Sequence, residues 1–235
     1  MDHGVTEGER VPQPTLLGRS DDTCELLLIR HGRSADVVPG SAEAADPGLH
    51  PDGRAQAAAL ARRLSAKPID AVYASHLRRA VETAGALAEP HGLSVRTDPA
   101  LQEVLLGDWG SGEFRRRAAV QEPEWVAWSR TRRWDGVPGG EGDDALRRRV
   151  VDCIEALAER HRGGTVAVVV HAGVINAYLA EVLGQALSLW LTVENTSITV
   201  VRAGPDGHHL VVANDCHHLY DPVLGPAATG DRKSR

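Results

Sequence analysis

Short apolar runs alternate with stretches of helical periodicity along most of this chain, and this alternation restricts the possible folds more than any other feature. The apolar runs have the length and composition of buried strands. We predict strands at Glu25–Ile29, Ala71–Tyr73, Thr165–Val170, Ser197–Val201 and Leu210–Val212, a weaker one near Leu93–Arg96, and helices at Asp52–Leu64, Leu77–Ala88, Asp143–Arg160 and Val174–Leu183. The pattern predicts an α/β fold, a three-layer sandwich with a mainly parallel sheet between helices.

The domain boundaries follow from where the periodicity stops. Residues 1–23 and 225–235 have none, so we expect flexible tails around one domain at 24–224. From about residue 105 to 144 the alternation breaks, which predicts an inserted cap. Trp125, Trp128 and Trp134 are expected to pack inside this cap.

Composition excludes several classes of partner. The formal charge of −6 and the pI of about 6.0 argue against nucleic-acid binding, which needs a basic surface. Three widely separated cysteines suggest neither disulfides nor a zinc site, so we expect a reducing cytoplasm. No apolar run is long enough to span a membrane, and we expect no membrane partner. A homodimer is the base-rate expectation for the oligomeric state.

Histidines follow two of the predicted strands at the point where each strand ends. The first strand runs into Arg30, His31 and Gly32, and the strand at Thr165–Val170 runs into His171. Gly32 permits a tight turn whose amides could face an anion, and Arg30 offers a planar fork for phosphate oxygens. Ligands of parallel sheets bind at the carboxyl ends of the strands, so both imidazoles are predicted to meet in one crevice.

Two further segments add a cation and an acid. Ser75 is predicted as the N-cap of the helix that follows it, which places Arg78 in the first turn, within reach of the crevice. Glu103 lies between apolar residues, and desolvation there would favour its neutral, proton-donating form. Each residue alone has an ordinary structural explanation, a solvated helix face or a surface glutamate.

Taken together, these segments resemble the histidine phosphatase superfamily, also called phosphoglycerate-mutase-like, over about residues 25–220. The resemblance rests on five blocks that occur in the family's order: Arg30-His31-Gly32, Ser75 to Ala84, Leu101 to Trp109, Pro138-Gly139-Gly140-Glu141 and His171-Ala172-Gly173. It implies a phosphomonoester hydrolase that acts on a small phosphorylated metabolite without a metal or cofactor.

The resemblance also implies a role for each matched residue. His31 would be the nucleophile that forms a phosphohistidine, and Glu103 the general acid. Arg30, Arg78 and His171 would hold the phosphate, with Gly32 and Ser34 as further phosphate-binding residues. The chain departs from the family at Val37, Gly110 and Gly142, where asparagine, glutamate and serine are frequent.

The cap holds six arginines and eight acids, so we expect mostly solvated helical faces rather than an additional anion pocket. The arginines are Arg115, Arg116, Arg117, Arg130, Arg132 and Arg133.

Three alternatives remain open at this point. A phosphoglycerate mutase is the closest, although the residues after Glu103 resemble the phosphatase branch. A catalytically inactive module that binds a phosphorylated ligand would not need the two histidines and Glu103 together. A metal-dependent hydrolase built on His208, His209, His217 and His218 lacks a matched carboxylate set.

Overall fold

The computed structural model describes residues 22–221 and 223, and the predicted flexible tails fall almost entirely outside this part of the chain. Six strands form one sheet: β1 (Cys24–Arg30), β2 (Ala71–Ala74), β3 (Val95–Thr97), β4 (Thr165–Val170), β5 (Ile198–Gly204) and β6 (Gly207–Asp215). Their order is β3-β2-β4-β1-β5-β6. The first four are parallel to one another, whereas β5 and β6 are antiparallel to their neighbours. The predicted mainly parallel sheet is confirmed.

The central strands are buried on both faces, which explains their unbroken apolar sequences. In β1, Leu26 and Leu28 belong to one hydrophobic cluster, while Leu27 and Ile29 belong to the other. Side chains alternate between the two faces of a strand, so a strand covered on both sides must be apolar at every position.

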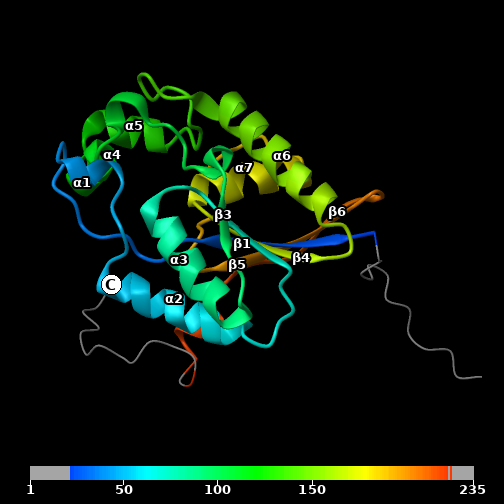
Figure 1. Cartoon of the computed structure of the whole chain (residues 1–235). Helices are drawn as coiled ribbons and strands as arrows, with labels where there is room; N and C mark the ends of the chain where they lie inside the picture. Colours follow the sequence, from blue (N-terminus) through cyan, green and yellow to red (C-terminus); the bar gives the residue numbers. More distant parts are fainter. Residues whose placement is uncertain (1–21, 222, 224–235) are drawn as a thin grey trace, which may run out of the picture.

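Four long helices cover the two faces of the sheet. Helices α2 (Pro51–Leu64) and α3 (Arg78–Ala88) lie on one face, and α6 (Gly142–Arg160) and α7 (Ala172–Leu183) on the other (Figure 1). Parallel strands that follow one another in the sequence are joined by crossover connections, and such helices form these connections on the faces of the sheet. The predicted three-layer sandwich therefore describes this structure.

Short helices gather beyond the end of the sheet at which β1 finishes (Figure 1). They are α1 (Ala42–Ala45), α4 (Glu113–Ala119) and α5 (Pro123–Ser129), with the 3-10 turns η2 (Pro99–Leu101) and η3 (Gly107–Trp109) nearby in sequence. Trp109, Trp128 and Trp134 are almost completely buried and pack around Phe114, with ring centroids between 5.4 and 6.3 Å apart. Trp125 packs against Phe114 and Trp128 at 6.2 and 6.4 Å, so all three predicted cap tryptophans pack as expected.

The start of α3 differs from the prediction. Ser75 is not its N-cap: the cap position is Leu77, and the Ser75 hydroxyl instead accepts a bond from the Leu77 amide at 3.3 Å. The helix begins at Arg78, two residues later than a Ser75 cap requires.

The remaining short elements are the 3-10 turns η1 (Glu89–His91) and η4 (His217–Leu219). None of the three cysteines, all of which lie in the described part of the chain, forms a disulfide. Among the described residues, no helix has both the length and the apolar character needed to cross a membrane.

Candidate active site

Pairing of β1 with β4 brings the two strand-end histidines together. Arg30 is in register with Val170, and the His31 amide donates to the Val170 carbonyl at 2.9 Å. The His31 and His171 rings lie edge to face with centroids 5.0 Å apart. The two histidines thus meet at the carboxyl edge of the sheet, as predicted.

The contacts of His31 define its protonation pattern. Its Nδ1 lies 2.7 Å from the Gly32 carbonyl oxygen, which can only accept, so Nδ1 carries the proton of the neutral ring. Its Nε2 accepts from Arg79 Nε at 3.2 Å and therefore holds the lone pair. Burial, followed by the positive charges of Arg79 and Arg30, holds the pKa of His31 well below 6.5. The neutral ring is stable at neutral pH, with Nε2 as its nucleophilic atom.

Arg79, rather than Arg78, faces the two histidines. Besides its bond to His31, Arg79 places Nη2 3.4 Å from His171 Nδ1, and only 11% of its side chain is exposed. Arg78 is 60% exposed and lies 4.0 Å from Glu82. Successive helical residues point about 100° apart, so only one of the two can face the crevice. Arg79 is the one that does, so the structure does not bring Arg78 to the crevice as the sequence analysis expected.

His171 is fully buried and has one nitrogen without a partner. Its Nδ1 is the atom beside Arg79, and its Nε2 makes no hydrogen bond to any described residue. Burial and the nearby His31 lower the pKa of His171 well below 6.5, so this ring is neutral too. With Nδ1 accepting, Nε2 carries a proton that lacks an acceptor in a buried position, where an unmade bond is costly.

Arg30 leaves the sheet beside His31 and lines the same cavity. Its Nη1 donates to the Val193 carbonyl at 2.5 Å, which anchors one edge of the guanidinium. Burial lowers the pKa of Arg30, and the negative charge of Glu103 opposes this shift. The group stays charged, since an arginine is not deprotonated in proteins.

Glu103 also borders the cavity, and its carboxyl group contacts the start of α7. Its Oε2 accepts from the Gly173 amide at 3.4 Å and its Oε1 from the Val104 amide at 3.0 Å. Desolvation raises the pKa of Glu103, against the lowering effects of these amides, Arg79 and Arg30. A Cβ on Gly173 would lie 2.4 Å from Glu103 Oε1, so a side chain there would displace the carboxyl group. The acid candidate therefore keeps its proton to higher pH than an ordinary glutamate.

Gly32 and Ser34 differ in how they meet the site. The Gly32 amide donates to Thr83 Oγ1 at 3.0 Å, and a Cβ on Gly32 would lie 2.6 Å from the Gly53 carbonyl oxygen. Gly32 thus allows close packing at the turn. The sequence analysis expected its amide to face an anion, but the structure directs it at Thr83. Ser34 does line the cavity, where its hydroxyl accepts from Arg115 Nη2 at 2.9 Å.

Arg115 is the residue that sequence reasoning assigned to the solvent and the structure brings to the cavity. The cavity measures about 560 Å³, far more than a phosphate requires, and Arg115 and Trp134 border it. Arg115 reaches Ser34 and, through Nη1, the Ala35 carbonyl at 3.1 Å. Its neighbours Arg116 and Arg117 instead pair with acids of the cap. Arg116 is 40% exposed, as expected for a solvated helix face, whereas Arg117 is only 18% exposed and lies over the Trp109 ring. Only the three-dimensional direction of α4 distinguishes them.

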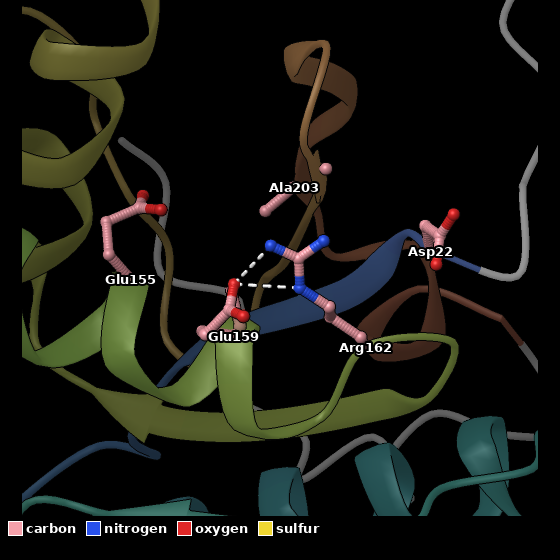
Figure 2. Close-up of a pocket in the computed structure, with 7 residues that line it drawn as sticks. Asp22, Glu155, Glu159, Arg162 and Ala203 are labelled. Atoms are coloured by element: carbon pink, nitrogen blue, oxygen red, sulfur yellow. Dashed lines mark hydrogen bonds and ion pairs between the residues drawn. The ribbon is translucent and has the colours of Figure 1, made fainter.

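A second, smaller cavity lies at the opposite edge of the sheet. It measures about 60 Å³ and is bordered by Glu155, Glu159, Arg162 and Ala203 (Figure 2). There Arg162 donates from Nε and Nη2 to one oxygen of Glu159, at 2.8 and 2.5 Å, so its charge is already paired. None of the predicted site residues borders this cavity.

The histidines near the C-terminus do not form a common site. His208 pairs with Glu155, the His218 ring bonds to Thr196, and His217 lies 3.8 Å from Asp221. Across the described part of the chain, no group of three or more His, Cys, Asp or Glu side chains is arranged to hold a metal ion.

The sequence profile of the histidine phosphatase superfamily (branch 1) matches residues 26–216. The chain belongs to this superfamily. The matched region contains both histidines, Arg79, Glu103 and all of the cap, and membership confirms the predicted family and the prediction of a phosphatase enzyme.

Several superfamily members are similar along most of their length. Phosphoglycerate mutase-like protein 4 of Arabidopsis thaliana is 32% identical over 91% of this chain and 95% of its own. The metal-independent phosphoserine phosphatase of the same plant is 33% identical, with 84% of each chain covered. The solved structure of mycobacterial glucosyl-3-phosphoglycerate phosphatase superposes with a TM-score of 0.69 at 28% identity, covering 82% of this chain and 99% of that one. These similarities confirm the α/β fold.

Proposed function

We propose that this superfamily member is a metal-independent phosphomonoester hydrolase that forms a phosphohistidine on Nε2 of His31. The observation that carries the proposal is the tautomer of His31. The Gly32 carbonyl holds the proton on Nδ1, so the lone pair on Nε2 faces Arg79 and the cavity. A neutral imidazole beside guanidinium groups is a nucleophile poised next to an anion site.

In the first step, His31 Nε2 attacks phosphorus and the bond from phosphorus to the ester oxygen breaks. Arg30, Arg79 and the free N–H of His171 Nε2 would hold the phosphate oxygens as charge develops. Glu103 donates its proton to the departing oxygen, and its raised pKa supports this role. The products are an alcohol and a phosphorylated His31.

In the second step, the Glu103 carboxylate accepts a proton from a water molecule that attacks phosphorus. The bond between phosphorus and Nε2 then breaks, which releases inorganic phosphate and restores both the neutral ring and the protonated acid. The guanidinium groups supply the positive charge throughout and the neutral His171 ring supplies a hydrogen-bond donor, so no metal is required. The name of the Arabidopsis metal-independent phosphoserine phosphatase supports this view.

The organic part of the substrate is proposed to carry a second acidic group. Three guanidinium groups and one carboxyl group border the cavity: those of Arg30, Arg79, Arg115 and Glu103. The hydrogen bonds of Arg115 go to uncharged acceptors, on Ser34 and Ala35, and Asp36 attracts its charge without a hydrogen bond to it, whereas Arg79 lies 3.9 Å from Asp46. A carboxylate on the substrate would complement Arg115.

Four expectations from the sequence stay predictions: a small metabolite as substrate, a cytoplasmic location, no nucleic-acid partner and a homodimer.

The test is a pair of alanine variants assayed by release of inorganic phosphate. His31→Ala should reduce turnover to background, and the exposed histidine variant His76→Ala should retain it. Wild-type protein quenched in alkali during turnover of a ³²P-labelled substrate should carry acid-labile label that His31→Ala lacks. Turnover by His31→Ala at a substantial rate would refute the nucleophile assignment. Interconversion of 3- and 2-phosphoglycerate faster than phosphate release would favour the mutase alternative.

A further inference from the structure

The loop that carries Glu103 has almost no backbone pairing of its own. Residues 103–106 belong to no helix or strand, and they connect η2 to η3 along the cavity wall. Backbone groups that leave regular structure need partners elsewhere, or the loop will not hold one position. The Val104 amide and the Leu106 carbonyl have nearby partners, Glu103 Oε1 and the Trp109 amide, and two residues far away in the sequence supply others.

Arg149, on α6, supplies the donors. Its Nη1 donates to the Ala100 and Gln102 carbonyls at 2.8 and 2.9 Å, and its Nη2 lies 3.4 Å from the Glu103 carbonyl. The planar guanidinium presents its N–H groups in a fixed fork, so one side chain fixes three carbonyls relative to one another. These carbonyls belong to Glu103, the acid candidate, and to residues one and three positions before it.

Glu141 holds the other side of the loop and also pairs with Arg149. Its Oε1 accepts from the Leu105 amide at 2.8 Å and its own amide donates to the Leu105 carbonyl at 3.0 Å. The same Oε1 lies 2.5 Å from Arg149 Nη2, and the two side chains are only 10% and 18% exposed. The ion pair therefore joins the contacts at Glu103 and before it to those at Leu105, so one network holds the loop on either side of the Glu103 side chain.

The turn before Glu141 packs directly against the end of this loop. The Asp108 amide donates to the Pro138 carbonyl at 2.9 Å. A Cβ on Gly107 would lie 2.2 Å from the Gly139 carbonyl carbon, so the two backbones meet where only glycine fits. The Pro138–Glu141 motif therefore packs against the end of the loop that carries Glu103, a contact that the sequence alone does not reveal.

We propose that Arg149 and Glu141 are positioning residues that set the place of the Glu103 carboxyl group against the leaving oxygen. This inference rests on the proposed role of Glu103 as the acid. Neither side chain borders the cavity, so both would act through the loop. Proton transfer requires hydrogen-bond reach, and a displacement of about 1 Å can cost on the order of a hundredfold in rate.

The test compares two leaving groups in Arg149→Gln, Arg149→Lys and Glu141→Gln. An alkyl phosphate needs a proton from the acid, whereas p-nitrophenyl phosphate departs without one. We expect kcat for the alkyl ester to fall about 10- to 100-fold in Arg149→Gln, with p-nitrophenyl phosphate changed by less than about threefold. Arg149→Lys, which keeps the charge, should recover part of the loss. The matched control is Arg148→Gln, an exposed position on the same helix, which should leave both rates unchanged.

The outcomes separate this inference from the function on which it rests. Equal loss for both esters, or no loss for either, in variants that keep the wild-type melting temperature would overturn the positioning role. Glu103→Gln is assayed in parallel. If it shows the leaving-group selectivity and the Arg149 and Glu141 variants do not, only the positioning role fails. If Glu103→Gln lacks the selectivity, the proposed acid is wrong. Should Arg149→Gln not fold, the Arg149→Lys and Glu141→Gln variants carry the same comparison.

Discussion

Adjacent residues in this chain have opposite environments, and Arg78 and Arg79 are the clearest pair. Both are arginines in the first turn of α3, yet one contacts His31 and His171 while the other lies beside Glu82 at the surface. Sequence position separates them by one residue, and the helix separates their directions by about 100°. Their substitutions are therefore a controlled comparison within the same turn.

We expect Arg79→Gln to lower kcat/KM about 100- to 1,000-fold, the typical cost of removing one donor that stabilises transition-state charge. Arg78→Gln should change kcat/KM by less than about threefold, as surface charges usually contribute little. Steady-state phosphate release measures both. A larger loss in Arg78→Gln than in Arg79→Gln would mean that the two exchange places when substrate binds.

At the scale of elements, α4 has one cavity-facing arginine and two that pair with acids of the cap. Arg115 reaches Ser34 and the cavity, whereas Arg116 and Arg117 pair with Glu113, Glu122 and Glu124. Only the first arrangement leaves a guanidinium at the cavity wall. Under the proposed function, this arginine would act on the choice of substrate.

The prediction for α4 concerns Arg115→Gln, with Arg116→Gln as its control. For a phosphate ester that also bears a carboxylate, such as phosphoserine, we expect KM to rise about 10- to 100-fold, the loss of one charged hydrogen bond. For a neutral alkyl phosphate the change should stay below about threefold. Initial-rate measurements on both esters test this. Similar increases for the two esters would assign Arg115 to the transferred phosphate itself.

On the scale of the whole molecule, burying two neutral histidines links folding to pH. The pKa values of His31 and His171 are both held below 6.5, chiefly by burial. Below pH 6.5 the unfolded chain binds protons that the folded chain does not, so stability decreases as the pH falls. Above that pH both states are neutral and this contribution is constant.

His31→Gln should accordingly reduce the loss of unfolding free energy between about pH 7.5 and 5.5, by at most about 1.4 kcal/mol, the linkage of one proton over one pH unit. The quantity to compare is the change in unfolding free energy with pH, because the substitution can also alter the stability at neutral pH. Urea titrations at both pH values give the measurement. His76→Gln, at an exposed position, should leave the slope unchanged. An unchanged slope in His31→Gln would indicate that His31 titrates normally in the folded protein.

The sequence by itself determined the sheet, its covering helices and the edge where the site lies. Unbroken apolar runs such as Val166–Val170 predict strands covered on both faces, and the polar residues that follow such strands should then meet at one edge. Arg30, His31 and His171 were predicted in this way, whereas Glu103 was predicted from its apolar neighbours. All four lie together at that edge.

Only the tertiary structure decided which neighbouring side chain faces the cavity. The helix α3 begins at Arg78 after a cap at Leu77, and Arg79 rather than Arg78 borders the cavity. The direction of Arg115, the use of the Gly32 amide by Thr83 and the network of Arg149 and Glu141 likewise depend on contacts between distant segments. Periodicity fixes which elements form, because it reflects local geometry and burial. The rotation of each element about its axis is set by packing against partners that the local sequence does not encode.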